Sequence, residues 1–233
     1  FWGNNNIISP TEEVKRIVEA ISKNNNENTI TGRQVNDPID TGWQYLNRNL
    51  FVSYQNEDTI TLIPIMRCWW EDEKTGGMLF KEMNGDFSIE TKISVTKTNI
   101  VEMPDKGFQQ AGIIVRNNSD QKENYIFLSI GTGGNSTPKI LFKKTIDNRS
   151  KTFAEKMENM NGWLRLEKKG NKLIALYKPE NNNEYKKIGE LTNEWLDSEI
   201  QIGLAVYTGF PGDGPNMKPD MKAEFTQLKI ETQ

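Results

Sequence analysis

The sequence predicts an all-β protein in which residues 41–233 form a two-sheet antiparallel sandwich and a short helix lies near residues 10–22. Two observations favour this fold. From about Trp43 onward, apolar and polar residues alternate with a period of two, and clusters of Gly, Asn, Asp and Pro separate the runs. No second helical pattern interrupts them, so alternating strands and helices are not indicated.

The first 40 residues differ from the rest. Residues 9–12 read Ser-Pro-Thr-Glu, which is typical of a helix N-terminus with a capping Ser, a Pro in the first turn and a Glu three residues later. The Asn-rich stretch 24–28 ends the helical pattern. We therefore expect a helix and linker over residues 1–40 and the sandwich over 41–233. The predicted helix carries one apolar stripe at Val14, Ile17, Val18 and Ile21.

The sandwich domain opens its clearest strand after the turn 84–86, where Phe87, Ile89, Ile93 and Val95 alternate with polar residues. The same reasoning predicts strands over 50–54, 59–65, 111–116, 125–130, 139–146, 163–168, 173–178, 200–207 and 224–231.

One hairpin can be predicted in register. A two-residue turn at Gly170 and Asn171 pairs Leu166 with Ala175 and Leu164 with Tyr177. The opposite face of this hairpin mixes aromatic, charged and aliphatic residues, whereas strands that face water are usually polar throughout. Another segment must cover that face, or it lines a groove. It carries Trp163, Arg165, Glu167, Ile174 and Leu176.

The composition excludes several functions. The 233 residues contain no His, which removes Ser-His-Asp and Cys-His catalysis and most zinc sites. The one cysteine, Cys68, cannot form an intramolecular disulfide. A formal net charge of −3 argues against nucleic-acid binding. No apolar run approaches the roughly 20 residues that cross a bilayer, so no membrane span is expected.

Four segments in order, 84–90, 110–116, 163–166 and 202–207, carry a family resemblance. The series of a Gly-Asp-Phe strand, an Ala-Gly-apolar-apolar-Arg strand and a Trp-Leu-Arg-Leu strand resembles the bacterial concanavalin A-like domains known as regulation-of-enolase-like proteins. The resemblance covers roughly residues 43–231. The family's next hairpin turn is replaced here by residues 179–185, with Tyr185 where an aromatic is expected.

The resemblance implies a jelly roll of two curved sheets whose concave face is available to a sugar chain. Many such domains resemble secreted proteins of polysaccharide-degrading bacteria, so an extracellular, periplasmic or cell-surface location is expected. The family has no agreed catalytic residues. The resemblance therefore favours a non-catalytic domain that binds a poly- or oligosaccharide or accompanies an enzyme.

Sugar binding requires flat aromatic faces and a few polar groups. Trp69 and Trp70 are adjacent, and on an extended backbone they point to opposite sides, so we expect one of them to face outward. Ordinary packing and cross-strand pairing are the alternative for all the candidates. The carbohydrate-binding candidates are Trp69, Trp70, Arg116, Trp163, Arg165 and Tyr207.

Two other functions stay open. A glycoside hydrolase needs a carboxylate pair, but Glu194 and Asp197 have opposite parity and read as a polar loop that buries Trp195. A pair from distant parts of the chain would still suffice. A structural module that contacts other proteins is the second alternative.

A calcium site is the one cofactor that the sequence suggests. Asp213 and Asp220 bracket a loop over 209–221 that is rich in Pro and Gly. Calcium takes six to eight oxygen ligands, and backbone carbonyls of this loop could complete the shell.

Overall fold

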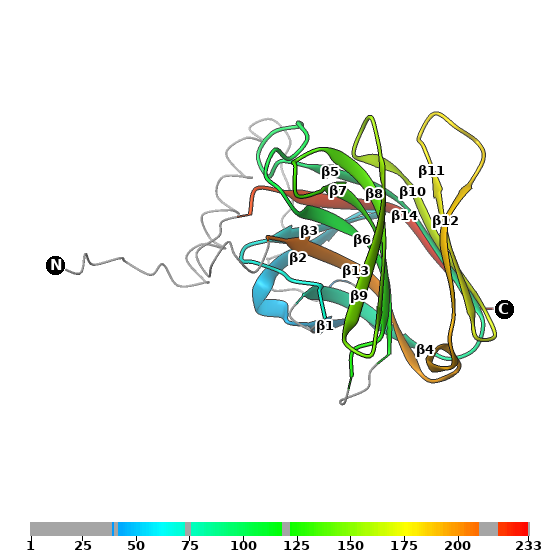
Figure 1. Ribbon diagram of the computed structural model, residues 1–233. Helices are drawn as coiled ribbons and strands as arrows, with labels where there is room; N and C mark the ends of the chain where they lie inside the picture. The colour runs from blue at the N-terminus through cyan, green and yellow to red at the C-terminus, as the bar shows by residue number, and fades with distance from the viewer. Residues whose placement is uncertain (1–38, 40–41, 73–75, 118–121, 210–218, 233) are drawn as a thin grey trace.

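The computed structural model describes residues 39, 42–72, 76–117, 122–209 and 219–232. Two antiparallel seven-stranded sheets pack face to face (Figure 1), so the predicted two-sheet sandwich is confirmed. The predicted helix at 10–22 and the Asn-rich linker lie outside the described residues. Among the residues described, no helix is long and apolar enough to cross a membrane.

The first sheet, sheet A, has its strands in the order β1 (Gln44–Leu46), β4 (Gly77–Met83), β13 (Ile200–Thr208), β6 (Gln109–Asn117), β7 (Tyr125–Thr132), β8 (Pro138–Ile146) and β9 (Arg149–Lys156). Sheet B has the order β12 (Lys186–Thr192), β11 (Lys172–Lys178), β10 (Asn161–Lys169), β5 (Phe87–Thr96), β14 (Lys222–Thr232), β3 (Thr59–Pro64) and β2 (Phe51–Asn56). Two short 3₁₀ helices, η1 (Arg48–Leu50) and η2 (Glu194–Asp197), complete the described elements.

The main core lies between the sheets and follows the alternation of the sequence. In β6, Ala111, Ile113 and Val115 are fully buried in this core. The residues between them therefore point to the outer face of sheet A, because successive side chains of a strand alternate. Burying one aliphatic side chain of this size contributes about 1.5–3 kcal/mol, so the repeated pattern fixes which face of each strand is inside.

The predicted β10–β11 hairpin is confirmed in register. Leu166 lies opposite Ala175 and Leu164 opposite Tyr177. Gly170 has a φ of 54°, a left-handed conformation that glycine adopts without steric cost. The turn residues therefore determine which side chains of β10 and β11 face the core and which face outward.

Four strands were not predicted: β1, β4, β9 and β12. β1 has only three residues, too few to show an alternating pattern. β9 and β12 are edge strands with mostly exposed residues, so neither shows the alternation of a half-buried strand. β4 begins with four successive buried residues from Gly77 to Phe80, because both faces of sheet A are covered there. The η2 region confirms the prediction for Trp195, which is buried in the core.

Two glycines bring neighbouring strands of sheet A close together. A Cβ on Gly112 would lie 2.0 Å from the backbone oxygen of Leu128, and one on Gly203 would lie 1.9 Å from that of Leu79. Both distances are far below van der Waals contact, so a side chain would force the strands apart. The centre of sheet A depends on these two residues.

Candidate functional site

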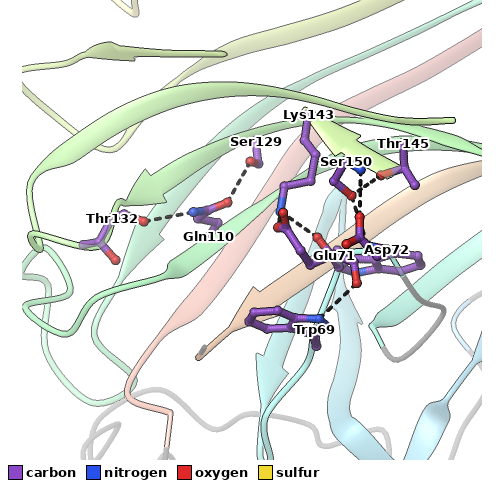
Figure 2. A network of polar contacts seen from close by, with 10 residues as sticks. Trp69, Glu71, Asp72, Gln110, Ser129, Thr132, Lys143, Thr145 and Ser150 are labelled. Carbon is purple, nitrogen blue, oxygen red and sulfur yellow. Dashed lines mark hydrogen bonds and ion pairs between the residues drawn. The ribbon is translucent and has the colours of Figure 1, made fainter. Parts of the chain in front are cut away.

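The outer face of sheet A is crossed by residues 68–72, which we call the strap. At one end, the backbone N–H of Cys68 donates to Oγ1 of Thr208 on β13 at 3.0 Å. At the other end, Oδ1 of Asp72 accepts from the backbone N–H of Ser150 on β9 at 2.7 Å. Because β6, β7 and β8 lie between β13 and β9, the strap passes over the middle of the sheet (Figure 2).

Both strap tryptophans pack onto the sheet. Trp70 is fully buried, and its Nε1 donates to the backbone oxygen of Val206 at 3.1 Å. Trp69 is 9% exposed, and its ring stacks on Tyr207 with 5.5 Å between centroids. The expectation that one of the pair faces outward is therefore wrong. Strict alternation holds within a sheet strand, whereas the strap lies across a sheet and turns both indoles toward it.

Lys143 on β8 fixes the strap. Its Nζ donates to the backbone oxygen of Trp70 at 2.6 Å, pairs with the carboxylate of Glu71, and lies 4.6 Å from the centroid of the Tyr207 ring. Burial lowers the pKa of Lys143, and the hydrogen bond with Glu71 opposes that change. A buried cation with three such contacts indicates a structural anchor for the strap.

Next to the strap, a row of polar groups is satisfied internally. Oε1 of Gln110 accepts from Ser129 at 3.3 Å, and Nε2 of Gln110 donates to the backbone oxygen of Thr132 at 3.0 Å (Figure 2). All three residues are buried. In the part of the chain that the structure describes, this face is a packed layer.

Arg116 lies on the same face, nearer the end of β6. It makes a bidentate ion pair with Glu123, at 2.7 Å through both Nε and Nη2, and donates to Oε1 of Gln201 at 2.6 Å. Its side chain is only 2% exposed. The structure thus gives Arg116 a buried partner on the protein itself.

The structure divides the predicted sugar-binding residues into two groups. Trp69, Trp70, Arg116 and Tyr207 lie on the outer side of sheet A. Trp163 and Arg165 lie on β10 of sheet B and point away from the core, because Leu164 and Leu166, which alternate with them, are buried in it. The six residues therefore do not form one site.

The group on sheet B is half-exposed and rich in polar partners. Trp163 is flanked across the strands by Lys92 of β5 and Lys178 of β11. Nζ of Lys178 lies 4.8 Å from the centroid of Trp163 and 4.9 Å from that of Tyr185, so the ammonium group contacts both aromatic residues. Tyr185 belongs to the loop 179–185, which an ion pair between Glu180 and Lys92 ties to β5.

Arg165 carries the charged half of this surface. Its Nη1 lies 3.1 Å from Oε2 of Glu90, and its Nε lies 2.6 Å from Oε1 of Glu167. Burial, with a further contribution from Glu90, raises the pKa of Tyr185 above its ordinary value. We call the surface formed by Glu90, Trp163, Arg165, Glu167, Lys178 and Tyr185 the B-face site.

Sequence reasoning identified part of this site. The hairpin register indicated that Trp163, Arg165 and Glu167 share a face, but Lys178 and Glu90 were not singled out. Both could have been found by extending the register, because Lys178 lies opposite Trp163 and Glu90 lies opposite Arg165.

The predicted calcium pair is only half described. Oδ1 of Asp220 accepts from the backbone N–H of Thr98 at 3.1 Å, so one carboxylate oxygen already has a partner in the protein. Asp213 lies outside the described residues. Among those described, no three acidic, His or Cys residues gather into a metal site. Calcium binding thus stays a prediction, and thermal unfolding in calcium and in chelator would test it.

Comparison with known proteins shows the fold. No protein-family model matches the chain, and no curated protein matches its sequence. A protein of unknown function from Saccharomyces cerevisiae matches with a TM-score of 0.62 at 15% identity, over 82% of this chain and 96% of that one. Lectin I-B4 from Griffonia simplicifolia matches with a TM-score of 0.54 at 8% identity, over 84% and 94%.

The GH43 protein BlXynB from Bacillus licheniformis matches with a TM-score of 0.63 at 15% identity, over 85% of this chain. The match spans only 38% of the BlXynB chain, so it corresponds to one part of that larger protein. The likeness to lectins confirms the predicted jelly-roll sandwich of the concanavalin A-like type.

Proposed function

We propose that the protein is a non-catalytic carbohydrate-binding or accessory sandwich and that the B-face site holds the sugar. The observation that carries this proposal is the half-exposed Trp163 beside Lys178 and Tyr185. The aromatic cluster under the strap is closed in the described structure, so it supports the fold rather than an open binding surface.

The chemistry of the B-face site suits a sugar. A pyranose ring stacks its apolar C–H face on an indole, and its hydroxyls need donors and acceptors fixed around that ring. Lys178 and Arg165 supply donors, and the carboxylates of Glu90 and Glu167 supply acceptors. Arg165 holds both carboxylates in place, which lowers the cost of ordering them when a ligand binds.

The structural neighbours include proteins named as lectins and as GH43 proteins, and this sandwich matches only part of the latter. An attached accessory domain is consistent with that coverage. We extend the proposal to membership of the regulation-of-enolase-like family and to a secreted or surface bacterial protein. Fractionation of the source cells tests the location.

A glycan array with the purified chain tests the proposal. We expect retention of at least one glycan without release of products. Release of shorter sugars would instead support a hydrolase with a carboxylate pair, and Glu90 with Glu167 would be its first candidates. Failure to bind any glycan would favour the structural module.

Trp163→Ala should reduce retention on the array, whereas Trp43→Ala should leave it unchanged. Trp43 is a matched control because it is also half-buried and also has a lysine, Lys81, over its ring, at 5.0 Å. Equal retention by the two variants would place the sugar site elsewhere.

A further inference from the structure

We propose that β9 is an interface through which two copies of this chain associate by antiparallel strand pairing. β9 is the last strand of sheet A, with β8 as its only neighbour among the described strands. Seven of its eight residues are exposed. The proposal is independent of sugar binding, because β9 and the B-face site belong to different sheets.

The direction of the hydrogen bonds in β9 follows from its hairpin. Asp147 and Asn148 form a two-residue turn with φ values of 50° and 62°, and Ile146 lies opposite Arg149. The closing pair of such a hairpin exchanges both of its backbone hydrogen bonds. Odd-numbered residues of β9 therefore bond to β8, and even-numbered residues direct their N–H and C=O groups outward.

Ser150 confirms this assignment. Its backbone N–H donates to Asp72 of the strap, on the side away from β8. Beyond Ser150, the outward groups of Thr152 and Ala154 lie along the open edge of the described sheet. These are the groups that a second strand would bond.

One register places complementary residues together. With a two-fold axis through Phe153, Thr152 of each copy lies opposite Ala154 of the other as a hydrogen-bonded pair. Lys151 then lies opposite Glu155 of the second copy, twice by symmetry. The two Phe153 rings meet at the axis, and Phe153 is 53% exposed in the single chain. Opposite charges and aromatic pairs at facing positions stabilise antiparallel strands.

The neighbouring registers are less favourable. A shift in one direction places Lys151 opposite Phe153 and brings Ser150, whose N–H Asp72 already occupies, opposite Ala154; in the proposed register Ser150 lies at the end of the paired segment, opposite Lys156. A shift in the other direction places Phe153 opposite Glu155 and leaves Lys151 without a charge partner. Glu155 also pairs with Lys186 of its own chain, yet its side chain is 48% exposed and has a second oxygen for Lys151.

The interface is small, so the dimer should be weak. A single strand pair buries less than the roughly 1,200–2,000 Å² of a standard interface, and we expect dissociation in the micromolar range. Charged residues on an edge strand also oppose unwanted pairing. The charges of β9 could thus either hold a specific dimer together or prevent association. A charge-exchange experiment separates these two roles, because only a specific ion pair is restored when its two members are exchanged.

The test is sedimentation velocity of the full chain at concentrations of about 5–500 μM. This range brackets the expected micromolar dissociation constant of the dimer. Lys151→Glu and Glu155→Lys each create two like-charge pairs and should weaken the dimer at least about tenfold. The double exchange should restore it to within about threefold. Lys169→Glu, an exposed residue at the far end of β10, is the control for the change in net charge and should have no effect.

Thr152→Pro is an independent second variant. It removes an outward N–H while leaving the hydrogen bonds between β8 and β9, so it should give a folded monomer. A wild-type chain that stays monomeric throughout the range would overturn the proposal. A dimer that persists in Thr152→Pro, or that the double exchange fails to restore, would show that association uses another surface.

Discussion

At the scale of single residues, burial controls the chemistry of Cys68. Complete burial raises the pKa of its thiol from an ordinary 9.0 to about 12. The thiol therefore stays protonated in the folded protein while the unfolded chain ionises it. The native cysteine should be nearly inert to thiol reagents at pH 8 and should react at once in denaturant.

The same shift predicts a dependence of stability on pH. Because the folded pKa lies above the unfolded one, the contribution of Cys68 is fully present below pH 9 and is lost between pH 9 and about 12. At pH 10 the loss is about 1.4 kcal/mol. Urea unfolding of the wild type and Cys68→Ala at pH 8 and 10 measures it. The gap between the two stabilities should change by this amount, and a constant gap would contradict the burial argument.

Two tryptophans that the sequence analysis proposed as sugar-binding residues should respond differently to substitution. Trp70→Ala removes a fully buried ring and a hydrogen bond, so it should lower the free energy of unfolding by about 3–5 kcal/mol. Trp163→Ala removes a half-exposed ring and should cost about 1 kcal/mol. Chemical denaturation of both variants gives the values, and equal losses would show that Trp163 is a core residue.

At the scale of elements, the strap depends on one buried lysine. Lys143→Met should lower stability by about 1–3 kcal/mol, because the backbone oxygen of Trp70 loses its donor in a buried place. Lys144→Met on the same strand is the control. Tryptophan fluorescence should shift to longer wavelength in Lys143→Met alone, and identical spectra for the two variants would mean that Lys143 does not hold the strap.

Element prediction succeeded where local chemistry decides the structure. The turn at Gly170 and Asn171 fixes the register of β10 with β11, and both residues are visible in the sequence. The edge strands β9 and β12 have mostly exposed residues, so burial does not impose an alternating pattern on them. Their sequences therefore did not predict strands. The path of the strap depends on Lys143 and Ser150, which lie more than 70 residues away, and no local pattern reports such contacts.

At the scale of the whole molecule, the two outer faces of the sandwich differ. The strap closes the outer face of sheet A, whereas sheet B leaves Trp163 and its polar neighbours half-exposed. The fold was predictable because period-two patterning recurs along the domain. The candidate site was predictable only in part, because parity assigns a residue to a face but does not show what covers that face.

The central claim is that the B-face site binds a sugar through Trp163. Titration calorimetry with the glycan that the array retains best tests it most directly. We predict that Trp163→Ala weakens binding by about 1–3 kcal/mol, or roughly 5- to 150-fold, while Trp43→Ala binds as the wild type does. Unchanged affinity in a folded Trp163→Ala chain would contradict the claim.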